Sequence, residues 1–439
     1  MFVRTKKSGR YTYLQVVENQ WRKGKVRQRV LGTLGRMDHL REGEKLVQLL
    51  RSTAKFVDDS LIVSPAAQDQ KLTIRPQRVG YVLVFGQLWA ETGCKAVLRA
   101  LSEERSAGFP VERALFLMVI HRLTDFGGIC SPDQWRRDYR MGGIASLTPD
   151  HLHQALVWLG EGTGETPSTV NAARFMKERI EEGLFRRRRE ATKGMETVRV
   201  FASSLSLDAA KRAPDELAPG ADLAPVRQHM VLAVAIDQTG RLICSETWPL
   251  PEIDGPLLRP LIERLRERFQ ARRIGLVCDE DAIGTAARDA GGIDEITILQ
   301  PNGADSASRE TNHLRLFPTI RHVFEAAAPL PAPPPENDHW PALLRGHLFC
   351  SHLALILRGA LEDRLEAAGY YFEWSDILHD LDHLIEVDLE QDTKKFTLST
   401  AADGTCGKVF EAVGVALPRS PESFGVQAPQ GSPTPSPVE

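Results

Sequence analysis

The stretch that decides the fold reads Ile274-Gly275-Leu276-Val277-Cys278-Asp279-Glu280-Asp281-Ala282-Ile283-Gly284. Its apolar run predicts a buried strand, and the residues from Thr285 to Ala290 predict a helix behind it. Asp279 is then at the carboxyl end of a strand, which in open α/β sheets is the edge where ligands and metals gather. We therefore expect an α/β fold with a candidate site at Asp279.

The residues before this stretch predict the rest of a sheet. Pro256–Gln270 has leucines and isoleucines at helical spacing, and Ile296–Leu299 predicts a last strand. Asp237–Gly240 predicts a tight turn between two earlier strands. Three alternating segments predict the first strands, which are Val198–Leu205, Met230–Ile236 and Arg241–Trp248. Three antiparallel strands, then helix, strand, helix and strand, indicate a ribonuclease H-like mixed sheet, because a doubly wound sheet would need helices between the early strands.

The N-terminal residues 1–36 are strongly basic, although the whole chain has a formal net charge of -3. They hold ten lysines and arginines and one acid, Glu18. Alternation over Thr12–Glu18 and Val26–Thr33 predicts a β-hairpin with two arginines on one face. Such a hairpin is either a solvated surface or a DNA-binding arm, and we favour the arm. The candidate DNA-binding residues are Arg22, Lys23, Lys25, Arg27 and Arg29.

A helical, DNA-binding domain is expected over residues 75–196. Val82–Thr92, Val111–Phe126 and Leu152–Trp158 have apolar residues three and four positions apart. The basic run Arg186–Arg189 ends a further helical segment, and we interpret it as a solvated helix end rather than a reader of bases.

The remaining segments complete the predicted domain order. Residues 37–74 are expected to form a helix and linker, 197–328 the sheet domain, 329–340 a proline-rich linker, and 416–439 a disordered tail. Residues 341–415 are expected to form helices and a hairpin. The expected elements there are helices at Leu343–Ala368 and Ser375–Leu384 and strands at Ile385–Leu389 and Lys394–Thr400, before the segment Cys406–Val413 closes the fold.

Composition excludes several classes of protein. The chain has 439 residues, 42% of them hydrophobic and 26% charged, which is typical of a globular protein with two or three domains. No run of eighteen apolar residues and no apolar segment after the N-terminal charges is evident, so we expect a cytoplasmic protein that does not enter a membrane. The six cysteines form no Cys-x-x-Cys pair, which favours reduced core thiols over zinc or disulfides.

Several segments, in this order, resemble the bacterial insertion-sequence transposases of the DDE type, in the IS-four superfamily. They are Val26–Arg36, Val111–Leu123, Trp135–Tyr139, Leu156–Leu159, Leu276–Asp279 and Gly346–Leu357. The resemblance implies cut-and-paste chemistry on double-stranded DNA at transposon ends, by a synaptic homo-oligomer. It also implies two Mg²⁺ ions held by three carboxylates, because hard cations prefer oxygen ligands and paired metals stabilise both oxygens of a phosphoryl displacement.

Only one of the three carboxylate positions of that family carries an acid here. Asp279 matches the second, whereas the Asp-x-Thr of the first strand is Phe201-Ala202-Ser203 and the helical glutamate is Arg321. The long β-rich insertion before that glutamate is reduced to Gln300–Phe317. Asp254 matches a further acidic position, for which we expect a structural role. The resemblance therefore implies a degenerate copy that holds Mg²⁺ weakly.

Three hypotheses remain open from the sequence. The first is a transposase-like DNA-binding protein without strand transfer, which we favour. The second is an active transposase in which Asp208 or Glu325 substitutes for a lost acid. The third is a regulatory or structural module. The pair His379 and His383 has zinc-ligand spacing, but no third ligand is evident, so zinc is not expected.

Overall fold

The computed structural model describes residues 2–8, 11–22, 25–36, 73–124, 139–163, 174–189, 196–208, 227–249, 255–279, 281–298, 316–325, 339–391, 394–399 and 404–417. Two compact units divide the chain. One unit comprises residues 1–72 with 391–393 and 424–439, and the other comprises residues 73–390 with 394–423. The predicted linkers and the predicted disordered tail fall almost entirely outside the described residues.

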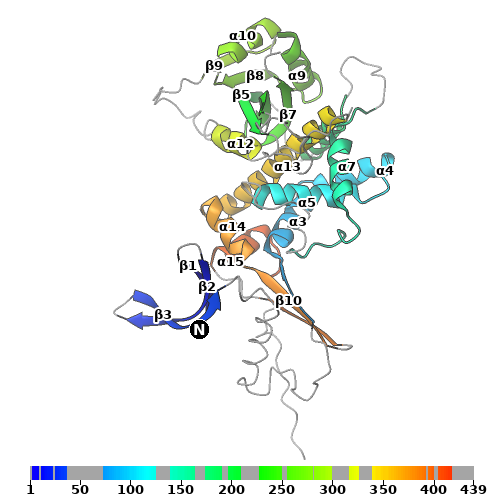
Figure 1. Ribbon diagram of the computed structural model, residues 1–439. Helices are drawn as coiled ribbons and strands as arrows, with labels where there is room; N and C mark the ends of the chain where they lie inside the picture. The colour runs from blue at the N-terminus through cyan, green and yellow to red at the C-terminus, as the bar shows by residue number, and fades with distance from the viewer. Residues whose placement is uncertain are drawn as a thin grey trace, which may run out of the picture. The chain divides into compact units, whose positions relative to one another are not determined.

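The first unit contains a three-stranded antiparallel sheet. Its strands are β1 (Phe2–Ser8), β2 (Tyr11–Arg22) and β3 (Lys25–Arg36), in the order β1-β2-β3 (Figure 1). The predicted hairpin corresponds to β2 and β3, with Arg22 paired to Lys25 at its closed end. The prediction was incomplete, because β1 adds a third strand that pairs along β2 from Phe2 to Ser8. Its basic residues obscured the alternation that marks a strand.

The second unit is built around a five-stranded mixed sheet. Its strands are β5 (Thr197–Asp208), β6 (Arg227–Asp237), β7 (Leu242–Pro249), β8 (Arg273–Cys278) and β9 (Glu295–Ile298), in the order β7-β6-β5-β8-β9. The first three strands are antiparallel neighbours, whereas β8 lies parallel to β5 and β9 parallel to β8. The predicted strands and their order are confirmed.

The turn between β6 and β7 forms as the sequence predicts. The Oδ1 of Asp237 accepts a hydrogen bond from the backbone N–H of Thr239, at 2.8 Å. Gly240 has a φ of 84°, a left-handed value that residues with a Cβ adopt with strain. The side-chain acceptor and the glycine together fix the tight connection.

Helices cover both faces of the mixed sheet. The helices α9 (Gly255–Glu267) and α10 (Asp281–Ala290) pack with one set of alternating strand residues, including Val200, Ala202 and Cys278. The opposite set, which includes Phe201 and Val277, belongs to a larger core shared with α12 (Leu316–Glu325) and α13 (Trp340–Ala367). Figure 1 shows the sheet between these helices. The strands β5, β6 and β8 are therefore largely buried on both sides, as their apolar runs predict, whereas the residues of the edge strand β9 are exposed or half-buried.

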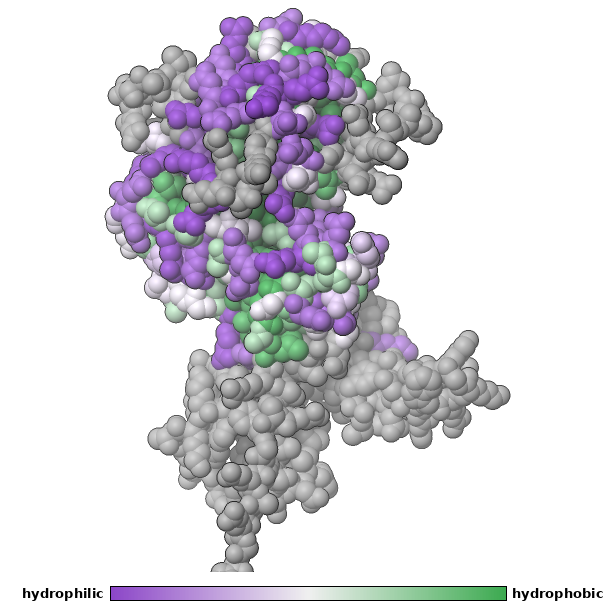
Figure 2. Space-filling model, turned by 180° about the vertical axis from the view of Figure 1, so that it is seen from behind, coloured by the Kyte–Doolittle hydropathy of each residue, from purple (hydrophilic) through white to green (hydrophobic). Residues whose placement is uncertain are grey.

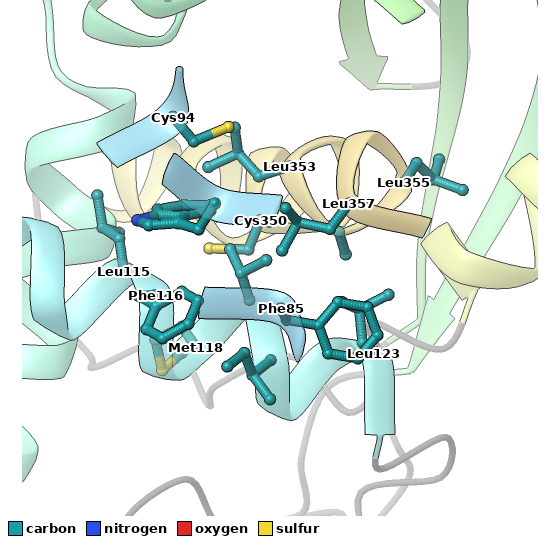
Figure 3. Packing of buried hydrophobic residues seen from close by; sticks show 14 of the residues in the cluster. Phe85, Cys94, Leu115, Phe116, Met118, Leu123, Cys350, Leu353, Leu355 and Leu357 are labelled. Atoms are coloured by element: carbon teal, nitrogen blue, oxygen red, sulfur yellow. The ribbon is translucent and has the colours of Figure 1, made fainter. Parts of the chain in front are cut away.

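The helical part packs around α13. Its helices are α3 (Gly80–Glu91), α4 (Cys94–Glu104), α5 (Val111–Thr124), α7 (Pro149–Gly160) and α8 (Met176–Arg189). Side chains of α13, such as Cys350, Leu353 and Leu357, meet those of Phe85 and Phe116 in one core (Figure 3). The predicted helices are confirmed, and α4 is an additional helix that was not predicted.

Within the described parts of the chain, one helix, α13, is long and apolar enough to cross a membrane by length and composition, with a mean hydropathy of 1.2 over its most apolar window. Of that window, 67% is buried inside the protein. On the face drawn in Figure 2, hydrophilic residues predominate among the coloured ones and hydrophobic residues form separate patches. This burial explains the apolar composition of α13, which is that of a helix in the protein core.

A second three-stranded sheet joins distant parts of the chain. Its strands β4 (Thr73–Arg78), β10 (Ile385–Gln391) and β11 (Lys394–Ser399) have the order β11-β10-β4. The hairpin of β10 and β11 was predicted. The predicted start of the helical region at residue 75 was wrong, because residues 73–78 form β4, which pairs antiparallel with β10. The helices α14 (Trp374–Asp382) and α15 (Thr405–Val413) lie on either side of this hairpin in sequence. The first agrees with the predicted helix, and the second shows that the segment Cys406–Val413, for which no element type was predicted, is helical.

Candidate functional site

Asp279 directly follows β8, and α10 begins two residues later. The last residue pair between β5 and β8 joins Ala202 to Cys278, so Ser203 and Asp279 are the next residues on two adjacent parallel strands. The predicted position of Asp279, at the carboxyl end of a central strand, is confirmed. The parallel pairing brings the segment Phe201-Ala202-Ser203 beside it.

The carboxylate of Asp279 is engaged by two donors through one oxygen. The hydroxyl of Ser203 donates to Oδ2 at 2.5 Å, and Nη1 of Arg321 donates to the same oxygen at 3.2 Å. The other oxygen, Oδ1, is buried and has no hydrogen-bond partner among the described residues. Arg321 is 43% exposed and Asp279 22%, so the ion pair contributes about 0–1 kcal/mol to stability.

Phe201, which the resemblance assigns to the first carboxylate position, lies inside the core. It is 1% exposed, and its ring centroid is 5.5 Å from that of Phe317 on α12. A phenyl ring provides no metal ligand. The strand position that would carry an acid is instead a packing contact between the sheet and α12.

The residues at this edge do not fit a magnesium site. Mg²⁺ requires several oxygen ligands in octahedral geometry, and this edge presents the carboxylates of Asp279 and Glu325 with the guanidinium of Arg321 between them, beside a phenyl ring. Among the residues that the structure describes, no group of three or more His, Cys, Asp or Glu is placed to hold a metal ion. His379 and His383, whose ring centroids are 4.3 Å apart, are not part of such a group either.

The proposed substitute acids have different positions. Glu325 accepts a hydrogen bond from Nε of Arg321 at 2.7 Å, one helical turn along α12, so it extends the ion pair of Asp279. Asp208 is the last residue of β5, six strand positions beyond the pair that precedes Asp279, and its side chain lies outside the described residues. Asp254 lies outside them as well.

The basic candidates lie on the three-stranded sheet of the first unit. Arg22 ends β2 and Lys25 begins β3, while Arg27 and Arg29 follow on β3, paired with Gln20 and Glu18. Lys23 falls outside the described residues. Lys6, on β1, has an exposed side chain.

A buried cluster of four charged residues was missed at the sequence level. Lys177 and Glu181 on α8 meet Glu246 on β7 and Arg264 on α9. Lys177 Nζ lies 2.8 Å from Glu246, and an Arg264 nitrogen lies 2.7 Å from Glu181. Burial lowers the pKa of Lys177, but the carboxylates of Glu181 and Glu246 outweigh it and raise that pKa. The sequence contains one signal for this cluster, which is that Lys177 and Glu181 occupy buried positions of α8.

A second missed feature is the buried carboxylate of Glu112. It accepts a hydrogen bond from Nε1 of Trp89 at 2.7 Å and pairs with Arg113 and Arg99. Burial favours its neutral form, but hydrogen bonding and the charge of Arg113 lower the pKa of Glu112. Glu112 therefore stays ionised and ties α3 to α5.

Residues 2–67 match the family model of the IS1634 family transposase, N-terminal domain. No curated protein matches the chain. Among solved structures, the chain is similar to the Mos1 strand transfer complex and the Mos1 mariner paired end complex with Mn, each at 15% identity and a TM-score of 0.16. Each alignment covers 75% of this chain, with 87% and 88% of the two Mos1 chains. A TM-score of 0.16 is too low to indicate a shared fold. The family match of residues 2–67 alone supports an insertion-sequence transposase function.

Proposed function

We propose that this protein is a transposase-type DNA-binding protein of an insertion sequence, that its second unit has a ribonuclease H-like fold of the DDE type, and that its catalytic site is impaired. The observation that carries the proposal is the match of residues 2–67 to a transposase N-terminal domain. The basic charge of the same residues and the strand order β7-β6-β5-β8-β9 support it. A cytoplasmic location and assembly as a homo-oligomer on two DNA ends belong to the same proposal.

Impairment of the site follows from its chemistry. Phosphoryl displacement in this class needs metal ions on both the attacking and the leaving oxygen. Asp279 is held by Arg321 and Ser203 instead, and Phe201 is packed on Phe317. The proposal therefore includes no magnesium-dependent step.

Fluorescence anisotropy on duplex DNA tests the binding part. The labelled duplexes would carry the sequences that flank the gene, and a scrambled duplex would serve for comparison. We expect affinity to fall steeply with salt, because bound phosphates release counterions. Arg27→Ala and Arg29→Ala should each weaken binding and reduce the log-log salt slope by about 1.

Arg259→Ala is the matched control, because Arg259 is an exposed arginine on α9 in the other unit and should leave both quantities unchanged. An affinity that is insensitive to salt, or to both arm substitutions, would contradict the DNA-binding proposal and favour a structural module. Magnesium-dependent nicking of the flank duplex that Asp279→Asn abolishes would contradict the impaired site and favour the active enzyme with substitute acids.

A further inference from the structure

We infer that the guanidinium of Arg321 is the built-in counter-ion of Asp279 and takes the place of a divalent metal ion at this edge of the sheet. The inference deepens the proposed function, and only its comparison with a metal-dependent enzyme rests on that function. It concerns which cation the carboxylate accepts, which is a property separate from DNA binding.

Neither carboxylate oxygen of Asp279 is readily accessible to a metal ion. Oδ2 accepts from both Ser203 and Arg321, and Oδ1 is buried. A divalent cation at Oδ2 would have to displace two donors and would stand within a few ångströms of a permanent positive charge. Mg²⁺ sheds its water only where several charged oxygens converge, and one carboxylate does not supply them.

Both positions that lack an acid are connected through α12, because Phe201 contacts this helix from β5 and Arg321 belongs to it. Phe201 packs on Phe317 in the first turn of α12, and Asp279 pairs with Arg321 one turn later. The two contacts together hold α12 against β5 and the carboxyl end of β8. An aromatic contact and an ion pair thus do the positioning that a shared metal ion would otherwise do.

Glu325 provides a second carboxylate beside Arg321, so a substitution of Arg321 could turn this ion-pair network into a metal site. It lies four residues from Arg321 and accepts from its Nε at 2.7 Å. Replacing Arg321 by a glutamate would bring together three carboxylates, at positions 279, 321 and 325, where one cation now separates two of them. Three converging carboxylates are a ligand set that hard divalent cations accept.

Titration with Mn²⁺ alone tests the inference, with the free ion followed by electron paramagnetic resonance. The wild-type protein should show no saturable binding, whereas Arg321→Glu should acquire a site that Asp279→Asn removes in the double variant. Arg358→Glu is the matched control, because Arg358 forms the same Nε-to-carboxylate pair four residues apart, with Glu362 at 2.8 Å on α13, and should acquire no site.

Two results would overturn the inference. One is saturable Mn²⁺ binding by the wild type that Asp279→Asn abolishes. The other is a folded Arg321→Glu protein, by circular dichroism, that binds no more Mn²⁺ than the control. If Arg321→Glu does not fold, Arg321→Asp supplies the third carboxylate on a shorter side chain, and a folded Arg321→Asp protein that binds no more Mn²⁺ than the control overturns the inference equally.

Duplex binding measured on the same preparations separates this inference from the proposed function. The wild type and the Arg358→Glu control, which leaves the Asp279 edge unchanged, should bind duplex DNA alike. Absence of DNA binding by every variant would end the proposed function while the Mn²⁺ result stood.

Discussion

His352 is a titratable side chain that the fold has removed from water. It lies on α13, is 0% exposed and stacks on Phe349 with ring centroids 5.1 Å apart. Neither of its ring nitrogens has a hydrogen-bond partner among the described residues. Burial lowers its pKa well below the usual value, and the charges of Lys177, Arg188 and Arg264 act in the same direction. His352 is therefore neutral in the folded protein.

This burial predicts a loss of stability in mild acid. An unfolded histidine has a pKa of about 6.5, so below that pH the unfolded chain binds a proton that folded His352 does not. Because of this residue, the free energy of unfolding should fall by about 1.4 kcal/mol for each pH unit below the pKa of the unfolded histidine. His352→Leu should flatten the curve measured by urea unfolding between neutral and acidic pH.

The exposed His229 provides the control for this prediction. His229→Gln should keep the wild-type dependence on pH. Equal slopes in the wild type and in His352→Leu would show that His352 takes up its proton without unfolding the protein.

At the scale of elements, α7 and α13 approach each other through two glycines. A Cβ on Gly346 would lie 1.9 Å from the carbonyl oxygen of Leu156, and one on Gly160 would lie 1.9 Å from that of Ala342. The obstacles are backbone atoms, which cannot rotate away. The helices can therefore cross this closely only because neither position carries a side chain.

Gly346→Ala should destabilise the protein by about 1–3 kcal/mol or more, since it forces two packed helices apart. The measurement is the free energy of unfolding in urea. Gly359→Ala is a control in the same helix, because a Cβ there meets nothing within 4 Å, and it should be neutral or stabilising by up to about 1 kcal/mol. Similar losses in the two variants would refute the role given to the crossing.

At the scale of the whole second unit, a charged cluster joins the helical part to the mixed sheet. Lys177 and Glu181 come from α8, whereas Glu246 and Arg264 come from the sheet and its covering helix. The side chains of Lys177 and Glu181 are 3% and 0% exposed. Water therefore does not replace a missing partner, and each charge depends on the others.

Removing one charge from this cluster should cost more than removing a pair. Lys177→Met leaves the carboxylates of Glu181 and Glu246 with Arg264 alone, and should destabilise by about 3–5 kcal/mol. Adding Glu246→Met should recover part of that loss, because Arg264 then has one buried carboxylate fewer to balance and keeps its pairs with Glu181 and Glu182. Thermal unfolding of the single and double variants checks this, and a double variant less stable than Lys177→Met would contradict it.

The sequence by itself determined the elements of the mixed sheet and the absence of acids at two positions. Local periodicity fixes strands such as β8 and helices such as α9, because a side chain's burial follows directly from its place in the repeat. The identities of Phe201 and Arg321 likewise need no structure. The same reasoning missed β1 and β4, whose basic and proline-containing sequences show no clean alternation.

Only the tertiary structure decided what the substituted residues do. Arg321 is 42 residues from Asp279 in sequence, and Phe201 meets Phe317 across a longer separation. Pairing of β4 with β10 and the charged cluster of α8 also join residues far apart in the chain. Sequence periodicity describes one element at a time, whereas an ion pair depends on where two elements are packed, which is set by the whole core.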